Sequence, residues 1–211
     1  DDGTVLKLTE AQLMHVLAPK VLGAWNLHTL TQHLDLDFFV LFSSAASLLG
    51  SPGQSNYAAA NAFLDALAQH RRSHGLCALS INWGPWTEVG LAAAQSNRGE
   101  RISLRGMGSI SPSEGVALLG TLLEREYTQI GVMPLDMRRW CQFYPRVADL
   151  PFLELLLRDQ AALEQALGVE DGVVTRRADA AAKGRDLLPG LRVAETLAPA
   201  PDGDRQVVNN P

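Results

Sequence analysis

Three polar side chains occupy positions from which they could meet around one reacting group. Ser44 closes a short apolar run at residues 38–42, which is typical of a strand buried on both faces of a parallel sheet. Tyr57 follows 13 residues later, near the start of an alanine-rich helical pattern, and Asn61 lies one helical turn beyond it. Residues four apart share a helix face, and open α/β sheets bind ligands at the carboxyl ends of their strands. A hydroxyl, a phenol and an amide can therefore converge on one point.

The chemistry that suits these groups is proton donation to a developing oxyanion. A phenol with a pKa of about 10 donates poorly near neutral pH unless a neighbour favours the phenolate, and an ammonium group does so. Lys20 is the only lysine between Lys7 and Lys183, so it is the one candidate for that ammonium. Positioned donors and general acid catalysis could each contribute roughly 10²–10³-fold in rate.

Each of these residues also has an ordinary structural explanation. Ser44 could cap a strand end, and Tyr57 could pack at a helix start. Asn61 could hydrogen-bond along a helix face, and Lys20 could be a solvated charge, as most lysines are. The four residues match jointly in type and spacing, which favours the functional interpretation over four unrelated structural roles.

The elements that must position these residues predict an α/β fold. Apolar residues at 38–42 and 78–83 predict strands that flank a helix over 55–74, with Arg71 and Arg72 exposed at its end. This is the pattern of a parallel sheet with right-handed crossovers. Thr9 predicts the start of an earlier helix, and Pro19 predicts a break or kink before a second helical piece over 19–33. Later elements are expected as a helix from Ser111 or Ser113 to about 126, a strand at 129–133 and helices at 136–140 and 153–167.

Composition argues against several classes of protein. Hydrophobic residues make up 46% and charged residues 19% of the 211 residues, as in an ordinary globular protein. The net charge of -5 without a basic block argues against nucleic-acid binding, and no apolar run approaches the roughly 18 residues of a membrane span. Two distant cysteines and five histidines without metal-ligand company predict no disulfide framework and no metal site. A cytoplasmic protein fits these features.

Two stretches resemble a known family. LFSSAASLLGSPGQSNYAAANAFLDALAQHRRSHGL at residues 41–76 and LSINWGPW at residues 79–86 are similar, almost word for word, to ketoreductase domains of modular polyketide synthases, which belong to the short-chain dehydrogenase/reductases. Ordinary members of that superfamily carry a lysine four residues after the tyrosine. In these ketoreductases that position is asparagine, and the lysine comes from the preceding helix. Asn61 and Lys20 match this swapped arrangement, and the resemblance covers about residues 1–155.

The resemblance implies a Rossmann-like fold and a reduction that depends on NADPH. The substrate would be a β-ketoacyl group on an acyl carrier protein, and the product a β-hydroxyacyl group. By the resemblance, Tyr57 donates the proton and Ser44 hydrogen-bonds the same oxygen. Lys20 would lower the pKa of Tyr57 and hold cofactor hydroxyls, Tyr57 would count with Lys20 among the cofactor-binding residues, and Asn61 would support a proton-relay water.

Further contacts are implied around this centre. Gly84, Pro85 and Trp86 match the segment that the family places against the nicotinamide carboxamide, and residues 87–108 would form a mobile lid over the substrate. Family members that give the D-configured alcohol (B-type) carry Leu-Asp-Asp in an earlier loop, and Asp1-Asp2 resemble its end. The opposite type has Trp eight residues before the tyrosine, where this chain has Leu49. The expected stereocontrol residues are Asp2, Leu49, Pro52 and Asn56.

The chain is expected to be one part of a larger protein. It starts without Met and lacks the glycine-rich turn that grips a pyrophosphate, so the N-terminal nucleotide-binding part of the fold is expected to lie upstream. The 211 residues alone are then not expected to bind NADPH. Residues 1–155 are assigned to the C-terminal part of the catalytic domain, and residues 156–211 to a helix and a disordered linker from about 170 onward. Other domains of the same synthase are expected partners.

Two alternatives remain open at this stage. A catalytically inactive, reductase-like domain could survive as structure within a megasynthase, although all four catalytic positions are present. A free-standing short-chain dehydrogenase could act on a small soluble substrate, although the swapped Asn61 and Lys20 and the long Pro-containing tail argue against it.

Overall fold

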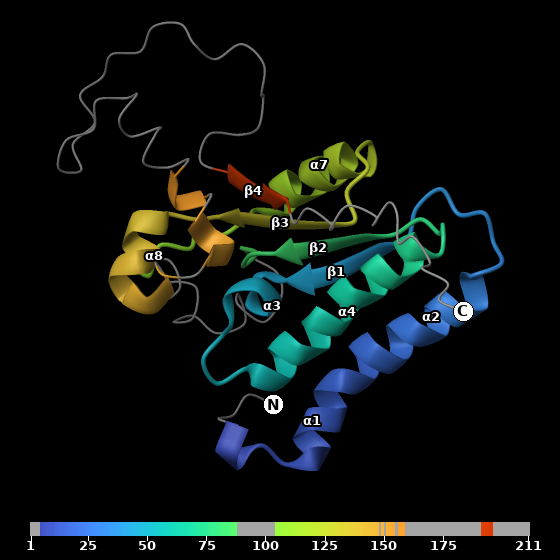
Figure 1. Ribbon diagram of the computed structural model, residues 1–211, viewed down its shortest axis with the longest axis horizontal. Coiled ribbons are helices and arrows are strands. Elements are labelled where there is room, and N and C mark those ends of the chain that lie inside the picture. The colour runs from blue at the N-terminus through green and yellow to red at the C-terminus, as the bar shows by residue number, and fades with distance from the viewer. Residues whose placement is uncertain are drawn as a thin grey trace, which may run out of the picture.

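A four-stranded sheet forms the centre of the described part of the chain. The computed structural model describes residues 5–87, 104–147, 149, 151–154, 156–158 and 191–195. Its strands are β1 (Val40–Ser44), β2 (Leu79–Trp83), β3 (Gln129–Pro134) and β4 (Leu191–Glu195), in the spatial order β1-β2-β3-β4 (Figure 1). The first three strands are parallel, and β4 joins β3 in the antiparallel sense. The predicted α/β fold with a parallel sheet is confirmed.

The strand register brings the carboxyl ends of the parallel strands to one edge of the sheet. Ser44 at the end of β1 pairs with Trp83 at the end of β2, and Trp83 pairs with Val132 of β3. The residues that follow Ser44 and Trp83 therefore leave the sheet side by side. This edge is where open α/β sheets bind ligands.

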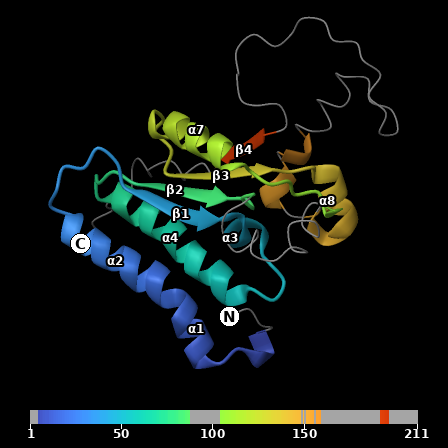
Figure 2. The same cartoon turned by 180° about the vertical axis from the view of Figure 1, so that it is seen from behind.

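Helices cover both faces of the sheet. The helix α4 (Ser55–Ser73) lies between the sheet and the helices α1 (Glu10–Leu17) and α2 (Gly23–Thr31) in both views (Figures 1 and 2). Its Leu64, Leu67 and Ala68 form a core with Leu41 of β1. On the other face, α7 (Pro112–Leu123) packs Leu118 and Leu122 against β2 and β3. Shorter helices are α3 (Ala45–Leu49), α8 (Met137–Phe143) and single 3₁₀ turns at Val5–Lys7, Pro145–Val147 and Pro151–Leu153.

The predicted break at Pro19 takes the form of a π-helical stretch. Thr9 caps α1 and its hydroxyl accepts the Gln12 N–H, as expected for a helix start. The chain then runs through a π-helical segment, Ala18–Leu22, directly into α2. Pro19 has no N–H to donate and its ring displaces the preceding turn, and a wider π turn absorbs that displacement without ending the helix. Lys20 lies within this widened turn.

Four features differ from the sequence-based expectations. The apolar run was expected to be buried on both faces of the sheet, but Phe42 of β1 is half exposed. The five-residue helix α3 was not predicted; it follows Ser44, whose side chain caps it. Residues 191–195 form β4, whereas the prediction was linker; Leu191 and Val193 alternate with Arg192, a strand pattern masked by the Asp-, Gly- and Pro-rich surroundings. Arg71 is buried, not exposed as predicted, because its guanidinium lies over the Phe39 ring at 3.8 Å.

Several expectations fall on other parts of the chain. Asp2, most of the expected lid (residues 88–103) and most of the helix expected at 153–167 lie outside the described residues. The same holds for most of the linker expected beyond residue 170. The division at residue 155 stays a prediction. Among the helices described, none has the length and apolar character that crossing a bilayer requires.

Burial of His28 makes fold stability depend on acid pH. His28 lies on α2, and its Nδ1 is 3.2 Å from Nη1 of Arg71. Burial, and then the positive charge of Arg71 with His70 and His74 nearby, lower the pKa of His28. Unfolded chains take up the proton near the ordinary histidine pKa, whereas the folded chain resists it. Stability is therefore unaffected above that pKa, and we expect it to fall as the pH drops below it.

Thermal unfolding measured between about pH 8 and pH 5.5 checks this expectation. The melting temperature of wild type should fall over this range more than that of His28→Gln, in which position 28 cannot titrate. His33 is exposed, and His33→Gln is the matched control with a wild-type fall. Equal falls in His28→Gln and wild type would contradict the prediction.

Candidate functional site

Ser44 sits where β1 ends and α3 begins. Its backbone is extended and its Oγ accepts the N–H of Ala46 at 3.2 Å, so it is the N-cap of α3. A hydroxyl can accept and donate at the same time. The capping bond uses only acceptor capacity, and Ser44 keeps its own hydrogen for a ligand. The structural role and the expected chemical role are therefore compatible.

Tyr57, Asn61 and Lys20 form the second part of the site. Tyr57 lies in the first turn of α4, and Asn61 one turn later donates from Nδ2 to the Tyr57 carbonyl at 2.8 Å. Lys20 approaches from the π-helical turn, with its Nζ 5.8 Å from the centre of the Tyr57 ring. The same Nζ donates to the carbonyl of Phe42 on β1 at 3.1 Å. The structure thus brings the four predicted catalytic residues to one end of β1.

Two of these residues, Lys20 and Asn61, have polar groups in unusual surroundings. Burial lowers the pKa of the Lys20 ammonium, and the negative charge of Asp65 partly opposes that shift. Asn61 is 0% exposed, and within the described residues its Oδ1 has no hydrogen-bond partner. Buried polar atoms are nearly always paired, so this oxygen is a ready acceptor beside Tyr57.

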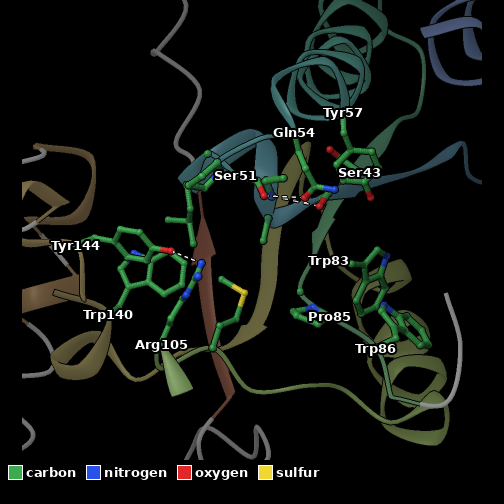
Figure 3. Close-up of a pocket in the computed structure, with 18 of the residues that line it drawn as sticks. Ser43, Ser51, Gln54, Tyr57, Trp83, Pro85, Trp86, Arg105, Trp140 and Tyr144 are labelled. Carbon is green, nitrogen blue, oxygen red and sulfur yellow. Dashed lines mark hydrogen bonds between the residues drawn. The ribbon is translucent and has the colours of Figure 1, made fainter. Parts of the chain in front are cut away.

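A cavity of about 370 Å³ opens at the carboxyl ends of β1 and β2. Most of the residues that the sequence analysis singled out line this cavity. Those that line it are Ser44, Leu49, Pro52, Tyr57, Gly84, Pro85 and Trp86. Lys20, Asn61 and Asn56 are not among the lining residues. Asn56 is buried, and its Oδ1 accepts the Tyr57 N–H at 2.9 Å. Figure 3 shows Tyr57 and Gln54 on one wall, with Trp83 and Trp86 on an adjacent one.

The far wall of the cavity consists of residues that the sequence analysis did not single out by number, although Arg105 lies in the segment 87–108 that was expected to cover the substrate. Arg105 is a charged residue in the lining, and its Nη1 donates to the Tyr144 hydroxyl at 2.8 Å (Figure 3). Trp140 and Tyr144 stand beside it, from α8 and the turn after it. Gly106 has a φ of 99°, and an added Cβ would lie 2.7 Å from the Asp136 carbonyl, so this turn needs glycine. Gly106 directly after Arg105 was the available sequence signal for a turn. Nothing in its spacing along the chain indicated that this turn lies near Tyr57.

The segment after β2 is held rigidly against the cavity. Pro85 accepts the Ile110 N–H at 2.8 Å through its carbonyl, and Thr87 donates to the Ile110 carbonyl at 2.9 Å. Gly84 lies so close to β3 that an added Cβ would be 2.8 Å from the Met133 Cβ. A backbone fixed in this way can present its polar groups to a ligand.

The cavity suits the nicotinamide end of a dinucleotide. Its walls include six aromatic side chains, those of Phe42, Tyr57, Trp83, Trp86, Trp140 and Tyr144, and a flat aromatic ring packs well against such surfaces. The buried Asn61 Oδ1 and the Lys20 ammonium add polar groups behind Tyr57. A glycine-rich turn for the pyrophosphate is not found among the described residues. The fit therefore concerns the reacting end of such a cofactor.

Comparisons with known proteins agree with this geometry. A family model described as "KR domain" matches residues 1–88. Polyketide synthase GfsB of Streptomyces halstedii is 43% identical over 197 residues, which is 89% of this chain and 4% of that protein. A mycocerosic acid synthase-like polyketide synthase of Mycolicibacterium smegmatis is 40% identical over 164 residues, 75% of this chain and 7% of that protein. The chain thus spans less than a tenth of the length of these curated relatives.

Solved structures give the same relationship in three dimensions. A structure titled as A-type ketoreductases from a modular polyketide synthase has a TM-score of 0.64 and 44% identity, covering 67% of this chain and 30% of that one. An A1-type ketoreductase has a TM-score of 0.64 and 43% identity, covering 67% and 29%. A C2-type ketoreductase has the same TM-score at 29% identity. The overall fold is therefore shared by more than one ketoreductase type.

Proposed function

Because this chain belongs to the ketoreductase (KR) domains of modular polyketide synthases, we propose that it carries the proton-donating half of an NADPH-dependent reductase. The proposed substrate is a β-ketoacyl group attached to an acyl carrier protein, and the product is the β-hydroxyacyl group. The observation that supports this most is the cavity that Ser44 and Tyr57 share at the carboxyl ends of β1 and β2.

In this proposal the chain's own residues handle the ketone oxygen and its proton. Tyr57 donates its phenolic proton to the oxygen as negative charge develops there, and Ser44 donates a hydrogen bond to the same oxygen. Lys20, held by the Phe42 carbonyl, keeps a positive charge near the Tyr57 ring. The Asn61 Oδ1 accepts from a relay water that returns a proton to Tyr57.

A bound NADPH would supply the hydride. Gly84, Pro85 and Trp86 would flank its nicotinamide, because they line the cavity and their backbone is fixed through Ile110. Lys20 would contact the cofactor's hydroxyl groups from behind Tyr57.

An exposed sheet edge supports the proposal that further chain completes the domain. Within the described residues, β1 pairs only with β2 and its other edge is open. Phe42, in the middle of β1, is 48% exposed, and Phe38 just before β1 is 61% exposed. Large apolar side chains at an open strand edge favour a missing covering layer. We propose that the upstream nucleotide-binding part pairs with β1 and covers Phe42, and that carrier and other synthase domains join it in one polypeptide.

The proposed product is the D-configured (B-type) alcohol. Leu49 and Pro52 line the same cavity as Tyr57, and Leu49 stands where the opposite type has Trp. Asn56 orients the first turn of α4 through its bond to the Tyr57 N–H. Chiral chromatography of the product from the complete reductase distinguishes this proposal from A-type reduction, the type in the titles of two similar structures.

A comparison of the 211-residue chain with the complete protein tests the proposed division between a proton-donating part and an upstream nucleotide-binding part. The 211 residues should show no micromolar NADPH binding by titration calorimetry, because the pyrophosphate turn lies elsewhere. The complete protein should bind NADPH in preference to NADH and consume it with a β-ketoacyl thioester. Micromolar NADPH binding by the chain alone would contradict the division, and a complete protein that reduces no ketone would contradict the function.

A further inference from the structure

A buried polar cluster lies directly beneath the proposed catalytic residues. It consists of Asp65 on α4, Ser47 on α3, and Ser80 and Asn82 on β2, and we call it the Asp65 cluster. Asp65 is 8% exposed, and Ser80 and Asn82 are fully buried. None of these residues lines the cavity, so a role in ligand contact does not explain them.

Every close neighbour of Asp65 in the cluster is a hydrogen-bond donor. The Ser80 Oγ donates to Oδ1 at 2.6 Å, and the Ser47 Oγ lies 2.7 Å from Oδ2. The Asn82 Nδ2 lies 3.0 Å and 2.9 Å from the two carboxylate oxygens. An ionised carboxylate only accepts hydrogen bonds, so this surrounding suits a buried negative charge.

The cluster reaches the backbone on both sides of the proposed site. The Ser47 Oγ is 2.8 Å from the Ser44 carbonyl, so its single hydrogen is shared between that carbonyl and Asp65. Asn82 Nδ2 also approaches the Ser43 Oγ at 3.1 Å, and Ser43 donates to the Asn61 carbonyl at 3.2 Å. Asp65 is thus connected to Ser44 through one intervening side chain and to Asn61 through two.

Asp65 also acts on Lys20 through its charge. Among the described residues, the Lys20 Nζ donates to the Phe42 carbonyl of β1 and lies 5.8 Å from the centre of the Tyr57 ring of α4, and the charge of Asp65, also on α4, influences its pKa. Burial lowers the pKa of Lys20, and Asp65 raises it. Removing the Asp65 charge would leave the burial effect unopposed, so Lys20 would lose its proton at a lower pH.

We propose that Asp65 is a positioning residue of the reductase, which fixes the backbone of Ser44 through Ser47 and that of Asn61 through Asn82 and Ser43. The proposal rests on the function proposed above, because it assigns work to Asp65 through two residues of that reaction. Asp65 touches neither substrate nor cofactor in it. Its two effects are separable: one travels through hydrogen bonds and the other through charge.

Replacing Asp65 by Asn in the complete reductase tests the effect of charge. Asp65→Asn keeps the size and one acceptor oxygen but removes the charge. We expect the alkaline limit of kcat to move to lower pH, and kcat to fall by about 10–100-fold, the cost of modest misplacement of reacting groups. The KM for NADPH should stay within about twofold. Asp37 is exposed, and Asp37→Asn is the control that should leave kcat and pH profile unchanged.

Two serine variants test the hydrogen-bonded route and remain informative if Asp65→Asn folds poorly. Ser47→Ala and Ser80→Ala each remove one hydroxyl donor to Asp65, but only Ser47 also contacts the Ser44 carbonyl. We expect Ser47→Ala to lower kcat about tenfold with the alkaline limit unchanged, and Ser80→Ala to lower the melting temperature while kcat is retained.

The outcomes separate this inference from the proposed function. An inactive wild type would overturn the proposed function itself. An active wild type, with equal kcat in the two serine variants, would overturn the route from Asp65 to Ser44. An unshifted alkaline limit in a folded Asp65→Asn would overturn its action on Lys20.

Discussion

Tyr57→Phe in the complete reductase is expected to lower kcat by about 10²–10⁴-fold, the usual contribution of a positioned general acid. The substitution removes one oxygen and leaves a ring of the same shape in the cavity wall. Lys20 keeps its contact with the Phe42 carbonyl, so the local fold is retained. The KM for NADPH should change little, because the lost interaction is made in the transition state. The measurement is steady-state NADPH consumption with a β-ketoacyl thioester.

The matched control is the same chemical change at a tyrosine outside the cavity. Tyr127 packs against the core beside α7 and does not line the cavity. Tyr127→Phe should keep kcat within about twofold. Unchanged product formation in Tyr57→Phe would remove the catalytic assignment of Tyr57, whereas an inactive wild type would favour the alternative of a structural, reductase-like domain.

Gly115→Ala is expected to destabilise the protein by about 1–3 kcal/mol, the range for overpacking a filled core. Gly115 lies in α7 against Trp86, and an added Cβ would fall on three carbons of the indole ring, well inside van der Waals contact. Trp86 in turn packs against Trp83 with ring centres 5.0 Å apart, so a shift of the indole would disturb that contact. Since Trp86 also lines the cavity, the proposed NADPH site should be weakened as well.

A second glycine of the same helix provides the control. Gly120 is exposed, and an added Cβ would meet nothing within 4 Å. Gly120→Ala should stabilise α7 by about 0.5–1 kcal/mol, because alanine loses less backbone entropy than glycine in a helix. Thermal unfolding of the complete protein should therefore show shifts of opposite sign. A Gly115→Ala variant as stable as Gly120→Ala would contradict the packing described for Trp86.

The elements around Ser44 and Tyr57 could be predicted because their signals are local. An apolar run, a glycine- and proline-containing loop and an alanine-rich helix follow one another over residues 38–74, and each has a characteristic pattern. The parallel register then brings Ser44 and the 84–86 segment to the same edge without further information. The position of the site therefore follows from short-range sequence patterns and the general rules of α/β sheets.

Of the opposite wall, only the segment that contains Arg105 was predicted, as part of a lid; its partners could not be predicted, since tertiary contacts assemble them. Arg105 reaches Tyr144 across 39 positions of sequence, and no helical or strand periodicity connects them. Trp140 has the apolar character of a core residue and is indeed buried. Its place in the cavity wall depends on how α8 docks beside β3, which the local pattern does not specify.

Arg71 shows how tertiary context overrides a sound local rule. A basic pair at a helix end usually remains in solvent and complements the helix dipole. Arg71 instead lies over Phe39, donates to the Cys77 carbonyl at 3.0 Å and contacts His28. These partners come from three other segments of the chain. Only Arg72 is exposed as the local pattern predicts.

A deuterium-transfer experiment examines the proposed chemistry at the atoms that react. The complete protein is incubated with a β-ketoacyl thioester and NADPH that carries deuterium at the transferring position, and the product is analysed by mass spectrometry and NMR. We predict one deuterium on the β-carbon of the β-hydroxyacyl product in wild type, and little product in Tyr57→Phe. Recovery of the unreduced ketone from a folded wild-type protein that binds NADPH would contradict the assignment of this cavity as a ketone-reducing site.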